Sequence, residues 1–317
     1  MTPITPATLD PSDHRPAPSA GRSPLADLAG LLRVGQWPKN LLVMAAPFAA
    51  GSVTGSAPSA ASGLGLLMLA MAAWCLASSA TYIVNDYRDR EQDRHHPVKC
   101  TRPLAAGTIN PVTALGLSLV LAALALVLGW RVAPQLSGLL AVYMALVTAY
   151  SIELKKVAVL DLLVVAAGFP IRAVSGAFAI DVPVTPWFVF VISSAALLVV
   201  SAKRLSELRR LGPEADNHRE VLSLYSERFL TQVHTLAIAF FLGVYAIWAV
   251  SVSAGTASRP TLTQFSIAPA ALVILRFSLL VDRGLVDRPE ELLYRDRVSQ
   301  LGALGWAATF YAGVVGW

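Results

Sequence analysis

The chain has 317 residues, of which 55% are hydrophobic and only 14% are charged, and its mean hydropathy is +0.59. Soluble domains carry about 25% charged residues. The composition therefore excludes a soluble two-domain enzyme and a disordered chain, and the presence of only two cysteines excludes a disulfide-stapled secreted domain. It predicts a protein that crosses a membrane several times.

The first 35 residues differ from the rest, because six prolines lie between Pro3 and Pro24 among serine, threonine and alanine. The segment lacks the basic start and apolar core of a signal peptide. We predict that residues 1–35 form a disordered cytoplasmic tail and that residues 36–317 form a single transmembrane domain.

Nine apolar stretches follow, each close to the ~20 residues that a helix needs to cross a bilayer. Barrel strands would be about ten residues long and would alternate in polarity, so the fold class predicted is all-α. The predicted spans lie near 40–56, 63–83, 111–130, 135–151, 160–179, 186–202, 230–252, 264–281 and 299–317.

The distribution of lysine and arginine predicts the orientation of these spans. With the N-terminus in the cytoplasm, 21 of the 25 basic residues fall in the tail and in the loops on the same side. Only Arg131 and Arg259 fall in outer loops, while Arg172 and Arg276 fall within spans. The positive-inside rule therefore puts the N-terminus and the polar loops in the cytoplasm and the C-terminus outside the cell membrane. Attraction to anionic membrane lipid accounts for the remaining basic excess, so no nucleic acid partner is expected.

An acidic motif ends the second predicted span. If the helix continues, steps of about 100° per residue place Asn85, Asp86, Asp89 and Asp93 within about 100° of one another. Three carboxylates on one face repel one another unless a cation lies between them, and oxygen ligands without histidine or cysteine suit Mg²⁺. The alternative is a solvated helix end whose acids pair with neighbouring arginines.

Further polar residues lie near the same membrane face. Lys99 and Arg102 follow the acidic motif and could neutralise a diphosphate held by the metal; alternatively they serve only membrane topology. After the sixth span, Lys203, Glu207 and Arg210 share a helix face, and this arrangement suits direct contact with anions more than a second acidic metal site. A basic helix end beside the membrane would look the same.

The fifth span contains a buried charge. Asp161 and Arg172 are 11 residues apart, so they lie on one helix stripe. An arginine this far into a span costs several kcal/mol unless it faces a polar cavity or a partner. We interpret Arg172 as functional, with an interior salt bridge to another helix as the alternative.

These motifs together resemble the UbiA superfamily of intramembrane prenyltransferases. The segments N-D-Y-R-D-R-E-Q-D and R-P-L-A-A-G are similar to its first aspartate-rich motif, and the likeness extends from about Arg33 to the C-terminus. Within the superfamily, the chain most resembles the decaprenyl-phosphate phosphoribosyltransferase branch. The segments that carry this likeness are Q-W-P-K-N from Gln36, Y-S-I-E-L-K from Tyr150 and R-A-V-S-G from Arg172. The usual second D-x-x-x-D motif is absent after the sixth span.

The resemblance implies a nine-helix bundle around a central cavity that is open to the cytoplasm. It also implies a Mg²⁺-dependent enzyme that transfers 5-phosphoribose from phosphoribosyl pyrophosphate (PRPP) to a long polyprenyl phosphate such as decaprenyl phosphate, and releases pyrophosphate. In the family this step supplies the arabinose donor of actinobacterial cell walls, including arabinogalactan. The enzyme would act in the plasma membrane, as a monomer or a homo-oligomer.

The resemblance also implies roles for individual residues. Asp86, Asp89 and Asp93 would be catalytic and would hold Mg²⁺ together with Asn85. The residues expected to bind PRPP are Lys39, Asn40, Lys99, Arg102, Lys203, Arg204 and Glu207. The residues expected to surround the lipid phosphate are Tyr82, Tyr150, Lys155, Asp161 and Arg172, with Asp161 orienting Lys155 or Arg172.

Two other functions remain possible from the sequence. An aromatic prenyltransferase would use an isoprenyl diphosphate donor, and the missing second acidic motif argues against it. A transporter of an anionic solute would be expected to show inverted repeats and helices broken at mid-membrane. The sequence shows no clear repeat, and its charges gather at one face of the membrane.

Overall fold

Long apolar helices dominate the computed structural model, which describes residues 23–50, 60–96, 98–211, 220–253, 262–284 and 296–315. Within these ranges, seven helical segments are long and apolar enough to cross a membrane. They confirm the prediction of an all-α, multi-pass membrane protein. The seven segments are α3 (Ala60–Arg94), α5 (Pro111–Val132), α6 (Pro134–Ile152), α7 (Leu160–Ala179), α8 (Pro186–Leu211), α10 (Glu227–Ser253), and α11 (Leu262–Phe265) continued by α12 (Ile267–Asp282).

The first and last predicted spans differ from these seven. The described part of the first span consists of the 3₁₀ helix η2 (Val34–Met44) and the short α2 (Ala45–Ala49), so it is not one long α-helix. The last coincides with α14 (Arg297–Val315), which has the length of a span but is not among the seven. The count of nine spans therefore stays a prediction.

The folded chain begins earlier than the sequence pattern predicts. Helix α1 (Pro24–Leu31) starts behind Ser23, whose side chain caps the backbone N–H of Ala26, and Leu31 is buried. Residues 24–35 therefore belong to the folded part of the chain and not to a disordered tail, because an apolar contact and a helix cap hold them there. Residues 1–22 lie outside the described residues.

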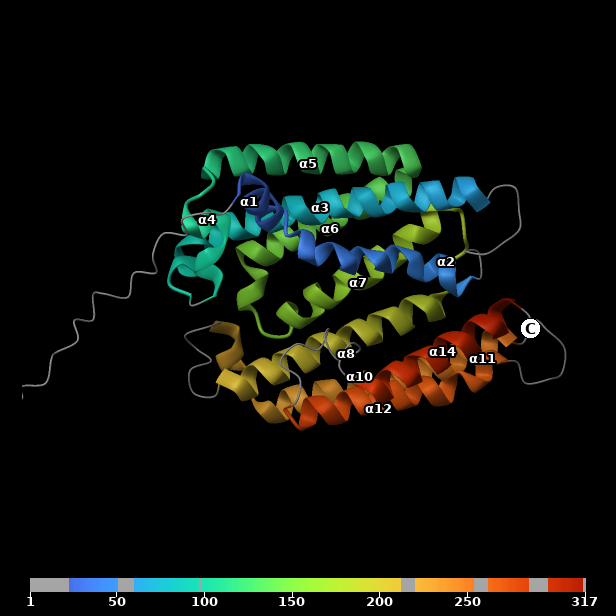
Figure 1. Ribbon diagram of the computed structural model, residues 1–317. Helices are drawn as coiled ribbons and strands as arrows, with labels where there is room; N and C mark the ends of the chain where they lie inside the picture. Colours follow the sequence, from blue (N-terminus) through green and yellow to red (C-terminus); the bar gives the residue numbers. More distant parts are fainter. Residues whose placement is uncertain are drawn as a thin grey trace, which may run out of the picture.

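The helices form two groups, which appear one above the other in Figure 1. In the first group α3 packs against α5, α5 against α6 and α6 against α7; in the second α8 packs against α10 and α12 against α14. Contacts between α7 and α8 join the groups. The short elements η3 (Lys99–Thr101), α4 (Pro103–Ala106), η4 (Leu154–Lys156) and η6 (Glu220–Leu224) connect the helices. We call the end of the bundle where α3 finishes near η3 and η4 the polar end.

Close backbone contact brings η2 against α7. A Cβ atom placed on Gly176 would lie 1.7 Å from the carbonyl oxygen of Val43, so only glycine allows this approach. Val43 is fully buried there. The approach places Trp37 and Asn40 of η2 against α3, where Trp37 bonds Ser79 and Asn40 bonds Ser78.

Candidate functional site

The acidic motif lies at the polar end, because α3 continues past its apolar part to Arg94. This confirms that the motif is helical. The side chains of Asp86 and Asp93 are only 3% exposed, whereas that of Asp89 is 21% exposed. Two buried carboxylates on the same helix face, about two turns apart, require nearby positive charge or hydrogen-bond donors.

Three cations surround the Asp86–Asp93 pair. Arg102 bridges the two acids, with its Nη1 3.0 Å from Asp86 Oδ1 and 2.6 Å from Asp93 Oδ2. Arg33 donates to both oxygens of Asp86, through Nε at 3.1 Å and through Nη2. Lys99 lies 3.9 Å from Asp93. The positive charges thus balance the acids and leave a cationic rim around them.

Asn85 and Asp89 form a separate pair one turn apart. Asn85 Nδ2 donates to Asp89 Oδ2 at 3.1 Å, and Ser151 donates to Asn85 Oδ1 at 3.0 Å. Lys155, on η4, lies 2.6 Å from Asp89 Oδ1. The acidic motif is therefore tied to the end of α6 and to η4 as well as to η3.

The four oxygen-bearing side chains do not converge on one point. Within the described residues, no three acidic, histidine or cysteine side chains are placed to hold a metal ion together. Their oxygen donors are of the kind that Mg²⁺ prefers, but guanidinium and ammonium groups now occupy them. A metal would fit this donor set only where it replaced one or more of those cations.

A second buried network lies between α7 and α8. Arg204 Nε donates to Asp161 Oδ2 at 2.9 Å, and its Nη1 donates to Glu207 Oε2 at 2.8 Å. Asp161 is fully buried and also accepts a hydrogen bond from the hydroxyl of Tyr225. Burial and the bond to Asp161 raise the pKa of Tyr225 above its ordinary value.

This network corrects one prediction. The sequence predicts that Asp161 orients Lys155 or Arg172, but it pairs with Arg204, because α8 packs along α7 and brings the guanidinium of Arg204 to Asp161. Lys155 instead pairs with Asp89. The guanidinium of Arg204 is committed to two carboxylates, so it contributes to the interior of the fold and not to an open anion site.

Arg172 lies in an aromatic box. Its guanidinium carbon is 4.8 Å from the ring centre of Trp74 and 5.2 Å from that of Tyr143. Nη1 donates to the carbonyl oxygen of Gly168 at 3.4 Å, so the side chain leans towards the polar end, and the buried Nε has no hydrogen-bond partner. Among the described residues, no carboxylate forms an ion pair with it. A buried guanidinium in this state is suited to meet an anion.

The other residues that the sequence predicts for the site differ in their burial and contacts. Tyr82 lies one turn before Asp86, and the guanidinium of Arg33 is 4.9 Å from its ring centre. Asn40 is buried and its Oδ1 has no partner. Lys39 and Lys203 are exposed, and Tyr150 is half-buried near the end of α6.

Three residues in the site were not assigned from the sequence. The sequence marks Arg33 only as one of the basic residues that set topology, and it predicts no role for Ser151 or Tyr225. The sequence holds no local signal for any of them, because their partners lie between 53 and 66 positions away. Tertiary contacts with Asp86, Asn85 and Asp161 bring them into the site.

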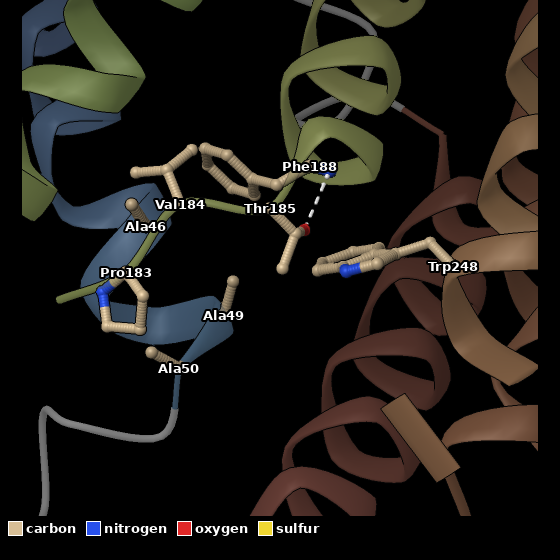
Figure 2. A pocket seen from close by; sticks show the side chains of 8 residues that line it. All are labelled: Ala46, Ala49, Ala50, Pro183, Val184, Thr185, Phe188 and Trp248. Atoms are coloured by element: carbon tan, nitrogen blue, oxygen red, sulfur yellow. Dashed lines mark hydrogen bonds between the residues drawn. The ribbon is translucent and has the colours of Figure 1, made fainter. Parts of the chain in front are cut away.

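Apolar cavities lie between α2 and the second helix group. The larger measures about 320 Å³ and is lined by α2, α8, α10, α12 and α14, including Phe241, Trp306 and Phe310. A smaller one of about 110 Å³ lies beside it, where Thr185 points towards Trp248 (Figure 2). Tyr245 is a polar lining residue of the larger cavity, and its hydroxyl is bonded to Ser266 and Trp306. Such a lining suits a hydrocarbon chain.

Comparison with known families gives one family match. The sequence profile of the UbiA prenyltransferase family matches residues 42–313. Among solved structures, a UbiA homologue from Archaeoglobus fulgidus bound to DMAPP and Mg²⁺ superposes with a TM-score of 0.70 at 17% identity, covering 92% of this chain and 100% of that one. The apo UbiA homologue from Aeropyrum pernix gives 0.56 at 18% identity, covering 86% and 96%.

Curated relatives cover nearly the whole chain. The decaprenyl-phosphate phosphoribosyltransferase of Mycolicibacterium smegmatis is 35% identical, over 97% of this chain and 98% of that protein. The protein of the same name from Mycobacterium tuberculosis is 36% identical, over 92% and 95%. That from Corynebacterium glutamicum is 34% identical, over 87% and 82%.

Proposed function

Since this chain belongs to the UbiA prenyltransferase family, we propose that it transfers 5-phosphoribose from PRPP to the phosphate of a long polyprenyl phosphate. The phosphate oxygen of the lipid attacks the anomeric carbon of the ribose, the bond from that carbon to the diphosphate breaks, and pyrophosphate leaves. The observation that carries the proposal is the cationic rim around the acidic motif. A curated relative that matches nearly the whole chain is named as a decaprenyl-phosphate phosphoribosyltransferase.

We place the PRPP diphosphate at the polar end. Arg102, Lys99 and Arg33 already bond carboxylates there, and a diphosphate offers them the same kind of oxygen acceptor. Lys39 and Lys203 are exposed, and we propose that they add positive charge for binding PRPP. Arg204 and Glu207 support the site from within, since they bond each other and Asp161.

Mg²⁺ is proposed as the cofactor. Asn85, Asp86, Asp89 and Asp93 would hold it, in place of one or more of the cations that now bond their side chains, among them Lys155 and Arg102. When bound, the metal would offset negative charge on the departing pyrophosphate. Its presence in a solved structure of the family fits this donor chemistry.

The acceptor phosphate is proposed to lie between Lys155 and Arg172, with Tyr82 and Tyr150 nearby. Its charge compensates the buried guanidinium of Arg172, which has no carboxylate partner among the described residues. A phosphate monoester is ionised at neutral pH, so it needs little help from a general base. The chain's own contribution is to position the two anions and to lower their repulsion.

The lipid chain extends towards the apolar cavity of about 320 Å³ in the second helix group. The polar end then faces the cytoplasm, where PRPP is available, and the protein lies in the plasma membrane with its C-terminus outside. The excess of lysine and arginine at the polar loops supports this orientation.

The test uses membranes that contain the full chain. They are incubated with radiolabelled PRPP, polyprenyl phosphate and Mg²⁺, and a labelled lipid that disappears with EDTA is expected. A parallel incubation supplies labelled isoprenyl diphosphate and an aromatic acceptor. Product in the second incubation alone would identify an aromatic prenyltransferase, and uptake of label without any product would indicate a transporter.

A further inference from the structure

Tyr225 connects the second helix group to the start of α7. It lies between η6 and α10, is 6% exposed, and stacks on Phe229 with ring centres 5.7 Å apart. Its hydroxyl donates to the carboxylate of Asp161 and accepts the backbone N–H of Val159 at 2.6 Å. One hydroxyl therefore satisfies a buried carboxylate and a backbone donor together.

Val159 has an unfavourable backbone conformation. Its φ is +69°, a region that β-branched residues rarely adopt because the side chain clashes with the backbone. Its carbonyl nevertheless accepts the backbone N–H groups of Leu162 at 3.1 Å and Leu163 at 3.0 Å, so the first turn of α7 is built on it. The hydrogen bond from Val159 to Tyr225 holds this strained junction in place.

The junction lies three positions after the end of η4, which carries Lys155. Lys155 lies 2.6 Å from Asp89 of the acidic motif, and η4 packs against both α7 and η6. A change of φ at Val159 would rotate the chain that joins it to Lys155, four positions earlier, and move the ammonium group of that lysine. The backbone at Val159 is therefore the point at which Tyr225 can influence the polar end.

We propose that Tyr225 is a positioning residue: its hydroxyl fixes the Val159 backbone and thereby holds Lys155 in register with the acidic motif and the acceptor phosphate. The proposal rests on the proposed function for its kinetic consequence. The Tyr225 hydroxyl contacts neither proposed substrate, because both of its bonds are internal to the protein.

The competing explanation is that Tyr225 acts only through Asp161, by satisfying a buried carboxylate. Combining Tyr225→Phe with Val159→Gly separates the two. Glycine adopts φ near +69° without the clash of a side chain, so it removes the need for the hydrogen bond at the junction. It does nothing for Asp161.

Four variants are compared with the wild-type protein: Tyr225→Phe, Val159→Gly, the double variant, and Asp296→Asn as a structural control. Asp296 pairs with Arg276 of α12 and accepts a hydrogen bond from Ser299 of α14, and neither partner has a role in the proposed site. For Tyr225→Phe we expect the KM for polyprenyl phosphate to rise about tenfold, as for one lost hydrogen bond, with kcat changed far less. The double variant should recover most of this loss, while Asp296→Asn should leave KM unchanged.

Hydrogen exchange provides a readout that does not need turnover. Tyr225→Phe should speed amide exchange in a peptide that covers residues 153–161, relative to the wild type. Unchanged exchange would overturn the proposal, whether or not the wild-type protein transfers phosphoribose. Faster exchange with a KM that the double variant does not restore would also overturn it, and would assign Tyr225 to Asp161 alone. If the wild-type protein forms no labelled lipid, the proposed function fails and the exchange result alone decides whether Tyr225 holds the junction.

Discussion

Arg172 offers the sharpest test of how the site works. Loss of its charge should lower the melting temperature if its role is structural, and should weaken the binding of polyprenyl phosphate if its role is functional. Replacement by methionine keeps a long, flexible apolar stem and removes the guanidinium. The two ring contacts, with Trp74 and Tyr143, contribute about 1–4 kcal/mol together. Burial of an arginine within a membrane span costs several kcal/mol in the opposite direction.

These opposing contributions nearly cancel when no anion is bound. Arg172→Met should therefore change the free energy of unfolding of the substrate-free protein by less than about 2 kcal/mol. A bond from a guanidinium to a phosphate contributes about 1.5–3 kcal/mol, so the variant should lose about 10- to 10²-fold in kcat/KM for polyprenyl phosphate. Arg172→Lys should keep part of that affinity and lose the flat stacking on the rings.

The assay combines thermal unfolding of the detergent-solubilised protein with transfer of label from PRPP to lipid. Polyprenyl phosphate should raise the melting temperature of the wild-type protein, since a ligand that binds only the folded state stabilises it. The same lipid should leave the melting temperature of Arg172→Met unchanged. A large drop in the melting temperature without lipid, combined with an unchanged KM for lipid, would refute the reasoning and assign Arg172 to the structure.

Three further predictions concern catalysis, packing and the buried network. Asp89→Asn should abolish label transfer while membrane insertion and melting temperature stay near wild type, because Asp89 is partly exposed; retained turnover would contradict the metal site. Gly176→Ala should destabilise the protein by several kcal/mol, since its Cβ would meet the carbonyl of Val43 at 1.7 Å; an unchanged melting temperature would show that η2 moves freely. Asp161→Asn should cost about 3–5 kcal/mol by leaving Arg204 without a full partner. Adding Arg204→Met should restore part of that loss, and strictly additive effects in this double-mutant cycle would argue against the pair.

Much of the fold could be predicted because the signal for a membrane span lies within the residues of the span itself. Bilayer thickness fixes the length of an apolar helix, so the segment that became α5 is visible from its own residues. Segment 40–56 was predicted by the same rule, but its described part contains η2. That element packs against α7 through the close backbone contact at Gly176, whose partner Val43 lies 133 positions earlier.

For the candidate site too, one part could be predicted from the sequence and another part depends on tertiary contacts. Helix periodicity placed Asn85, Asp86, Asp89 and Asp93 on one helical segment, and α3 confirms that they are helical. Periodicity could not show that they separate into two pairs. That division depends on Arg102 reaching Asp93 and on Lys155 reaching Asp89, which are contacts with other elements.

The sequence by itself determined that this protein is a multi-pass helical membrane protein with its acids and cations concentrated at one end. It could do so because hydrophobic length, helix period and charge bias act within a few turns of chain. Only the tertiary structure decided which cation meets which acid. Asp161 takes Arg204 and Tyr225 from 43 and 64 positions away, and Arg172 is left among aromatic rings. A buried charge without a partner costs free energy, so each of these contacts matters for stability, and the packing of the chain selects the partners.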